Sequence, residues 1–317
     1  MKRSIRSGAV FIAILLGSSL ASGQDLPNYD AYLDAPATLA RVARSPAASS
    51  LGVALSFDTR SGVPAFLWAS QRPQGQGLAA SRGVEDAARL HLGRYAHLYD
   101  APRRAADAAE VALVHDTGSG GIVVTLRQRI DGIEVYRGEV KVLMKRNLDL
   151  VAISGSLRRS GEAEEASRHS FLIGPSQAVA KALEDLHGIP FDAPDLRAST
   201  KEMVGYQVFD LAPPPGSPAA KLRFLQPARV KPVFFPMSDR LVPAYFLELF
   251  VDSADDPTSA AYAYVLAADD GRLLLRRNLT ESDSFNYRVW AHPTDHRPLD
   301  GPQADFTPHP ASVPDGT

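Results

Sequence analysis

Alternating apolar and polar residues between Gly121 and Leu157 predict three antiparallel strands joined by two tight turns. The apolar positions of the first strand share one side and are Ile122, Val124, Leu126 and Ile130. The polar positions on its other side are Thr125, Arg127 and Arg129. Asp131-Gly132 suits the first turn because glycine adopts a positive φ without strain. The second strand then alternates again, with Val140, Val142 and Met144 directed inward, so the stretch predicts a half-buried β-meander.

Two segments have the period of an amphipathic helix. Residues 81–99 repeat apolar side chains at intervals of three and four, with Glu85 and Asp86 in the first turn, where the helix dipole favours acids. Residues 174–188 begin with Gly174-Pro175 and end at Gly188, the usual start and stop signals. Each helix is expected to pack on a neighbouring sheet.

The remaining strands complete a repeated order of helix and meander. They are predicted at residues 53–57, 63–69, 111–114, 201–209, 222–225, 230–235, 243–251, 260–267 and 272–278. The predicted fold class is therefore α+β, with two modules that each pack a helix on an antiparallel β-meander. A flexible N-terminal lead is expected before them, and an extended C-terminal tail after them.

The two modules and their flanks give five predicted regions. These are a signal peptide at 1–23, a flexible lead at 24–50, a first module at 51–160, a second at 170–280 and a tail at 281–317. The signal peptide is predicted from Lys2, Arg3 and Arg6, followed by an apolar run at 9–16 and small residues at 21–23. We therefore expect secretion, to the periplasm or the extracellular space, and no membrane association after the signal is removed.

Composition narrows the classes of partner. The chain has no cysteine, which excludes disulfides and cysteine-based zinc or nucleophile chemistry. Residues 1–23 hold three basic and no acidic residues, so their removal changes the formal net charge from −2 to −5. An acidic mature chain argues against nucleic acid as a partner, because phosphate binding needs a basic face.

The sequence predicts no catalytic, cofactor-binding or metal-binding residue. None of the eight histidines is followed by glutamate, so the HExxH zinc motif is absent, and no GxSxG sequence marks a nucleophile. His91 and His97 are six residues apart and lie on different sides of a helix. Two metal alternatives stay open: His292 and His296 with Asp295, and Ca²⁺ at the acidic turn 252–256. In both cases solvated loop side chains are the simpler interpretation.

Two sets of residues resemble known families. Gln128, Asp131, Gly132, Ile133, Val135, Tyr136 and Gly138 resemble the core of the fungalysin/thermolysin propeptide domain. Tyr264, Asp270 and Gly271, with the preceding alanine-rich helix, resemble the PepSY domain that follows it in secreted metallopeptidase precursors. Together the two resemblances cover about residues 50–280.

The resemblance implies the pro-region of a fungalysin-type zinc metallopeptidase. Such a pro-region assists folding of the catalytic domain, blocks its active-site cleft and is removed by proteolysis, here near residues 280–286. Residues 281–317 would then link to a catalytic domain that is missing from this chain. That domain, acting in cis or in trans, is the expected partner, and it would hold the only zinc. The chain itself is then not an enzyme.

Two other interpretations remain. In the first, the chain is a stand-alone exported inhibitor or protein-binding module that acts on peptidases to which it is not fused. It is a hydrolase only if residues far apart in the sequence assemble a site that the local patterns do not show.

Overall fold

The computed structural model describes most of the chain between residues 26 and 280. The described residues are 26–34, 54–58, 64–69, 83–99, 101, 103–158, 162, 165–166, 170–254 and 256–280. The predicted signal peptide, most of the N-terminal lead and the predicted tail therefore lie outside the described residues, as do His292, Asp295 and His296.

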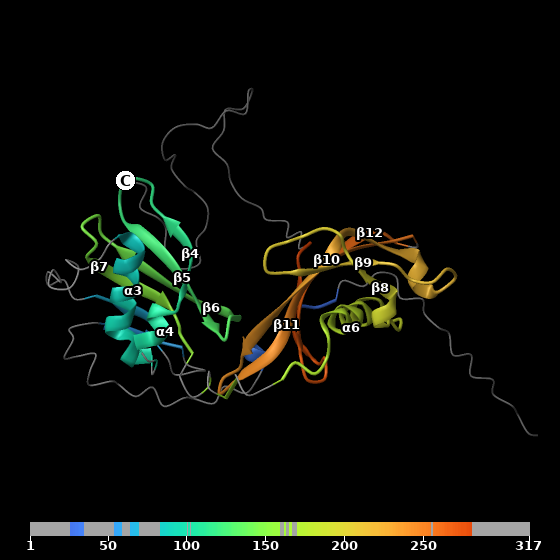
Figure 1. Cartoon of the computed structure of the whole chain (residues 1–317), viewed down its shortest axis with the longest axis horizontal. Coiled ribbons are helices and arrows are strands. Elements are labelled where there is room, and N and C mark those ends of the chain that lie inside the picture. The colour runs from blue at the N-terminus through green and yellow to red at the C-terminus, as the bar shows by residue number, and fades with distance from the viewer. Residues whose placement is uncertain are drawn as a thin grey trace, which may run out of the picture. The chain divides into compact units, whose positions relative to one another are not determined.

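Strands are the commonest elements of the described structure (Figure 1). They are β1 (Tyr29–Asp30), β2 (Ala54–Phe57), β3 (Pro64–Trp68), β4 (Glu110–His115), β5 (Ile122–Ile130), β6 (Ile133–Met144), β7 (Leu150–Gly155), β8 (Leu196–Ala198), β9 (Gln207–Leu211), β10 (Leu222–Pro236), β11 (Leu241–Ser253), β12 (Asp256–Ala267) and β13 (Leu273–Asn278). The α-helices are α1 (Ala31–Asp34), α3 (Val84–Tyr95), α4 (Arg103–Asp107) and α6 (Pro175–His187). Short 3₁₀ turns occur at η2 (Ala96–Tyr99), η3 (Ala193–Asp195) and η4 (Pro218–Lys221).

All the described strands belong to one 13-stranded mixed sheet. Its main order is β1-β13-β12-β11-β10-β6-β7-β3-β2, with β4-β5 joined to β6 and β8-β9 joined to β10. The prediction of an α+β fold with two separate helix-on-meander modules is therefore wrong. The finding that overturns it is the parallel pairing of β6 with β10, in which Glu134 and Val135 lie opposite Val233 and Phe234.

The length of β6 explains this junction. β6 has 12 residues, but β7 pairs only with its second half, from Val140 to Met144. The first half of β6 extends past the end of β7 and leaves an edge, which β10 occupies. A parallel contact between strands about 100 residues apart has no local sequence signature, because its partners are not joined by a turn.

The local patterns predicted most elements correctly. The structure confirms the meander at 122–155 and the helices near 84–99 and 175–187. The predicted strands at 222–225 and 230–235 are one strand, β10, which passes through Pro227 at a shift of register between Gln226 and Arg229. Proline lacks an N–H group, and a bulge is where a strand tolerates that loss. Thr125, expected to face solvent, is buried.

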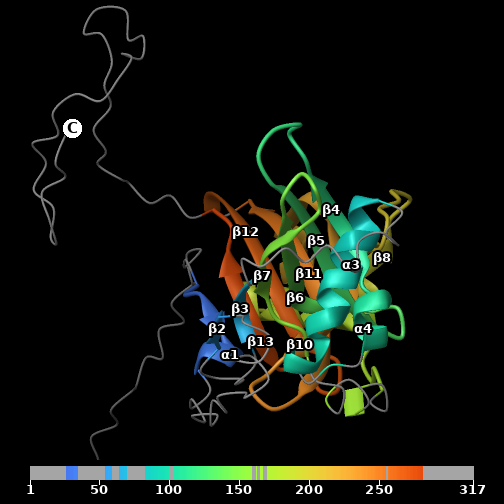
Figure 2. The same cartoon turned by 90° about the vertical axis from the view of Figure 1, so that its left-hand side faces the viewer.

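Figure 2 shows α3 and α4 lying together over one face of the sheet. Two large apolar clusters pack beneath the helices, one under α3 and one under α6. In the first, α3 contributes Leu92 and Tyr95, which pack with Leu126 and Val142 of β5 and β6. In the second cluster, α6 packs on one face of the strands β10, β11 and β12. Its members include Val179, Leu183, Leu247, Leu249 and Tyr264. Within the described residues, no helix has both the length and the apolar character that crossing a bilayer requires.

Candidate functional site

The residues of the first resemblance lie along β5 and β6 at the junction with β10. Gln128 is buried, and its side chain binds both main-chain groups of Arg158, which follows β7. The Arg158 N–H donates to Gln128 Oε1 at 2.8 Å, and Gln128 Nε2 donates to the Arg158 carbonyl oxygen at 3.3 Å. One amide thereby attaches the segment after β7 to β5.

Backbone conformation explains the turn residues of this set. Asp131 and Gly132 have φ values of 50° and 81°, the pair of positive values that a tight hairpin turn between β5 and β6 requires. Ile133 follows directly and pairs with Ile130. Four residues later, Arg137 also has a positive φ, of 57°, and Gly138 follows it.

Gly138 lies where β6 exchanges one neighbour for another. Pairing with β10 ends at Val135, and pairing with β7 begins at Val140. A Cβ atom on Gly138 would lie 2.8 Å from the Val135 side chain, so the chain needs glycine at this position. We call the region between the ends of β10 and β7, at β6 residues 136–139, the β6 fork.

A cavity of about 170 Å³ lies at the β6 fork. Its lining includes Tyr32, Asp58, Tyr136, Arg137, Arg158 and Phe235. The two arginines are engaged within the protein: Arg137 pairs with Asp30 at 2.7 Å, and Arg158 pairs with Glu162 at 2.7 Å. The cavity is smaller than most small-molecule sites, and both of its arginines are already paired with carboxylates.

Residues 26–34 contact early, middle and late parts of the described chain. β1 pairs with β13, and Asp30 reaches Arg137 of β6. Tyr32 donates a hydrogen bond to Asp58 at 2.7 Å, next to β2. We call residues 26–34 the N-terminal strap because they contact strands from both halves of the sheet.

Tyr136 connects the β6 fork to an aromatic group on β10 and β11. Its ring stacks on Phe235 and Phe246, at centroid distances of 5.8 and 5.7 Å. Burial raises the pKa of the Tyr136 phenol, so this group stays neutral at physiological pH. Lys231 lies 5.6 Å from the centroid of Phe246 and 5.2 Å from that of Tyr206.

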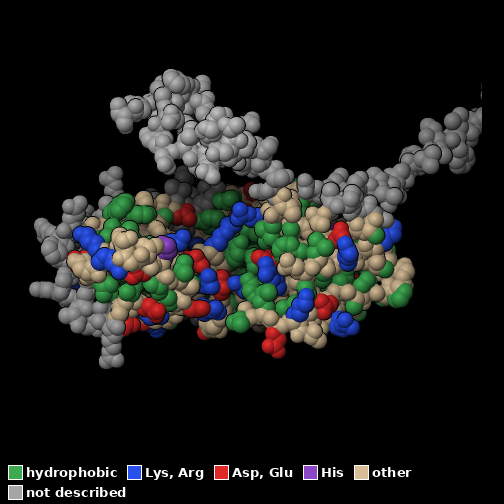
Figure 3. All heavy atoms as spheres, turned by 90° about the horizontal axis from the view of Figure 1, so that it is seen from above, with side chains coloured by type: hydrophobic (Ala, Val, Ile, Leu, Met, Phe, Trp, Pro, Cys, Tyr) green, Lys and Arg blue, Asp and Glu red, His purple; other side chains and the backbone are tan. Residues whose placement is uncertain are grey.

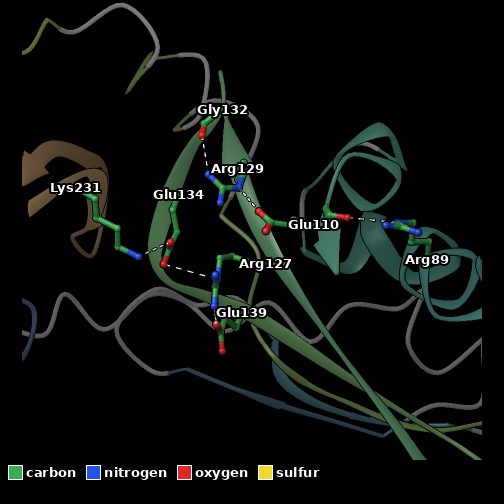
Figure 4. A network of polar contacts seen from close by, with 9 residues as sticks. Arg89, Glu110, Arg127, Arg129, Gly132, Glu134, Glu139 and Lys231 are labelled. Atoms are coloured by element: carbon green, nitrogen blue, oxygen red, sulfur yellow. Dashed lines mark hydrogen bonds and ion pairs between the residues drawn. The ribbon is translucent and has the colours of Figure 1, made fainter. Parts of the chain in front are cut away.

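A row of ion pairs continues from this aromatic group across β6 and β5 (Figure 4). Lys231 of β10 binds Glu134 of β6 at 2.7 Å, and Arg127 of β5 contacts Glu134 at 3.7 Å and Glu139 at 2.8 Å. Arg129 pairs with Glu110 and donates to the Gly132 carbonyl oxygen at 2.8 Å. The hydrogen bond from Arg129 holds the pKa of Glu110 below its usual value.

The same side of β10 and β11 carries further pairs. Because side chains alternate along a strand, Leu247 and Leu249 face α6, and Phe246, Glu248, Phe250 and Asp252 face the other way. Arg229 pairs with Glu248 and lies 5.8 Å from the Phe250 ring, and Arg223 pairs with Asp252 at 2.5 Å. We call this side of the sheet the open face. It is defined by Tyr206, Arg223, Arg229, Lys231, Phe246, Glu248, Phe250 and Asp252.

The residues of the second resemblance lie in a different part of the sheet. Tyr264 of β12 is buried under α6 and donates to Asp185 at 3.0 Å, and Asp185 also pairs with Arg276 at 2.6 Å. Asp270 and Gly271 form the turn between β12 and β13, where Asp270 accepts a bond from the Arg272 N–H and Gly271 has a φ of 77°. The two resemblance sets do not converge on one site.

Several of the polar residues considered in the sequence have structural roles in the described part of the chain. The described residues contain no group of three or more His, Asp or Glu side chains that could hold a metal ion. Buried His91 bonds through Nε2 to the Leu148 carbonyl oxygen at 2.8 Å, while His97 is exposed. Asp252, one of the acids considered for Ca²⁺, is paired with Arg223.

Comparisons with known proteins add little to this geometry. No protein-family model matches the chain, and no curated protein matches it. Among solved structures, it is similar to the Bacillus megaterium YpeB C-terminal domain, with 12% identity over 72% of this chain and 77% of that chain. The TM-score is 0.26, a value at which the likeness supports no conclusion about fold or function.

Several residues of the site have no clear signal in the sequence. Arg158 lies at the end of the predicted first module and Glu162 lies in the charged stretch between the two modules, yet both side chains are nearly buried. Lys231 and Asp30 have no local signal, because their partners are about 100 residues away. The open face did have a signal, which was the alternation of aromatic and acidic residues at 246–252.

Proposed function

We propose that this chain is the pro-region of a secreted fungalysin-type zinc metallopeptidase, and that it binds the catalytic domain through the open face. The observation that carries the proposal is the composition of that face. Interfaces between proteins are enriched in aromatic residues and arginine, and the open face combines Tyr206, Phe246 and Phe250 with Arg223 and Arg229.

The charges of the open face also suit a protein partner. Lys231, Glu134, Arg229 and Glu248 have side chains that are only 13–29% exposed, so these pairs are partly desolvated before any partner binds. Paired charges of both signs give orientation and specificity to a complex. In Figure 3 acidic and basic side chains are interspersed with hydrophobic ones, with no large region of one sign on the face in view.

The resemblance of the β5–β6 hairpin to the fungalysin/thermolysin propeptide domain selects the class of partner. A broad β-surface can bind the partly folded catalytic domain as well as its native state, and thereby both assist folding and exclude substrate. The partner supplies the zinc and all the catalytic residues.

The test uses the full chain without its predicted signal and a panel of fungalysin-type catalytic domains from the same organism. Two quantities are measured: the rate of peptide hydrolysis with added chain, and the yield of active enzyme after refolding with and without it. Loss of activity together with a higher yield is the expected result. Inhibition without a gain in yield would indicate a stand-alone inhibitor, and no effect on any member of the panel would refute both functions.

A pair of charge-reversal variants locates the surface. Arg223→Glu on the open face should weaken inhibition at least about tenfold, since an unfavourable charge at an interface costs more than about 1.4 kcal/mol. Glu184→Lys changes the charge by the same magnitude, with the opposite sign, on the exposed side of α6 and should leave inhibition unchanged. Equal effects of the two variants would show that the open face is not the contact.

A further inference from the structure

β4 is an outer strand with exposed apolar side chains. Among the described strands it is bonded only to β5, so its other side presents N–H and C=O groups that could pair with another strand. Leu113 is 58% exposed and Val114 is 37% exposed, and Ala112 and His115 are exposed as well. The other outer strands β1, β2 and β8 have two, four and three residues, whereas β4 has six and contains neither lysine nor proline.

We propose that two copies of this chain associate through β4, antiparallel and about a twofold axis, so that their sheets become continuous. The strand Glu-Val-Ala-Leu-Val-His is nearly self-complementary when it is paired with its own reverse. Centred between Ala112 and Leu113, the pairing places Glu110 opposite His115, Val111 opposite Val114 and Ala112 opposite Leu113. Every one of these pairs occurs twice, as a symmetric interface requires.

The irregularity in β4 makes this register possible. In a regular strand, Val111 and Val114 would face opposite sides of the sheet and could not be partners. The register with β5 shifts between Val111 and Leu113, so that Val111 lies opposite Leu126 and Val114 lies opposite Val124. Leu126 and Val124 belong to one apolar cluster, so Val111 and Val114 share that side of the sheet.

The same shift aligns the polar ends. Glu110 lies opposite Arg127 and His115 lies opposite Val123, two positions of β5 on the side away from the apolar cluster. Glu110 and His115, which can share a hydrogen bond, therefore meet on one side at each end of the paired strands, and Val111 and Val114 meet on the other. The self-complementary order of side chains thus selects a second copy as the occupant of this edge.

The first experiment measures the mass of the full chain in solution by light scattering, at concentrations up to about 100 µM. A particle of twice 34.1 kDa, less the signal peptide where it has been removed, is expected. Leu113→Lys places two charges beside the twofold axis and should halve the mass. Val204→Lys is the matched control, at a position outside β4 that is 99% exposed, and should not change the mass.

A cross-linking experiment tests the register. Because the chain has no native cysteine, any disulfide must form between the introduced residues. Mixed Val111→Cys and Val114→Cys copies should form a disulfide under oxidation, because opposed residues lie within the 4.4–6.8 Å that a disulfide spans. Each variant alone should not, since three residues along a strand separate its two cysteines by roughly 10 Å. Circular dichroism verifies that each variant is folded.

Three results would overturn the proposal. These are a monomer at all concentrations, a dimer that Leu113→Lys leaves intact, and cross-linking by one cysteine variant alone. If Leu113→Lys instead abolishes binding of a peptidase by a monomeric chain, β4 serves that partner and the dimer is refuted. Because Arg223 of the open face is not in β4, failure of the dimer leaves the test of peptidase binding unaffected.

Discussion

Gln128 is the polar side chain on which the segment after β7 depends most directly. Its amide donates to and accepts from the main chain of a single residue, Arg158, in a buried environment. The Arg158 side chain then bonds to Glu162 and to the Met237 carbonyl oxygen at the end of β10. A glutamine amide is one of the few side chains that can satisfy an N–H and a C=O group together.

Replacement of Gln128 by alanine should therefore lower the free energy of unfolding by about 2–4 kcal/mol, because two buried main-chain groups lose their partners. Urea denaturation followed by circular dichroism measures this change. Gln207→Ala, at an exposed position, is the control and should change stability by less than about 0.5 kcal/mol. Similar values for both variants would show that the Arg158 groups find other partners.

His91 gives stability a dependence on pH. Burial lowers its pKa below the usual value, although the bond to Leu148 opposes the shift. Because the unfolded chain binds the proton more tightly, acidification below about pH 6.5 favours unfolding, with a slope of at most about 1.4 kcal/mol per pH unit for this group. Stability should accordingly fall between pH 6.5 and 5.

The variant His91→Gln retains a donor for the Leu148 carbonyl oxygen but does not titrate. Its stability curve should be flatter than that of the natural chain between pH 6.5 and 5. His97→Gln alters an exposed histidine six residues further on and serves as the control. Parallel curves for His91→Gln and the natural chain would contradict the assignment.

At the scale of elements, the β6 fork depends on two glycines. Gly138 lies against Val135, and Gly155 of β7 lies against the Glu139 carbonyl oxygen with a φ of 95°. Both glycines bring main chains closer than a side chain would allow. They allow β10 to pair with the first half of β6 and β7 to pair with its second half.

Gly155→Ala should destabilise the protein by more than about 3 kcal/mol, because the new Cβ overlaps the Glu139 carbonyl group and the φ value is unfavourable as well. Gly132→Ala is a matched comparison, since Gly132 has a similar φ of 81° but open space around it. It should cost only about 1 kcal/mol. Thermal unfolding of both variants separates the steric cost from the conformational one.

The elements that the sequence predicted well are those with strong local periods. The hairpin of β5 and β6, helix α3 and helix α6 all fall within a few residues of their predicted bounds. β1 and β8 were missed, because two or three residues cannot show a period of two. The turn at Asp131-Gly132 was predictable from its residue types, whereas the neighbours of Tyr136 come from β10 and β11 and were not.

At the scale of the whole molecule, one sheet replaces the two modules that the sequence suggested. The repeated order of helix and meander is real, but it does not show whether the meanders share a sheet. That depends on the pairing of β6 with β10, which only the folded chain reveals. The open face follows from the same pairing, since Lys231 and Glu134 belong to the two strands.

Continuity of the sheet predicts that the two halves unfold together. Leu126→Ala removes a buried side chain from the first apolar cluster and should cost about 2–5 kcal/mol. Hydrogen exchange should then rise in β11, in the other half, as well as in β5. Leu172→Ala, at a position that is 72% exposed, is the control. Unchanged protection of β11 in Leu126→Ala would show that the halves unfold separately.

The N-terminal strap has a consequence for biosynthesis. Arg276 of β13 donates to the carbonyl oxygen of Pro27, 249 residues earlier in the chain. The first described residues to leave the ribosome can meet Asp58 and Arg137 earlier, but they cannot pair with β13 until nearly all of residues 26–278 have been translated. Contacts this distant slow folding. Residues 26–34 should accordingly be among the last to become protected after synthesis, and they will be accessible to chaperones and proteases for most of that time.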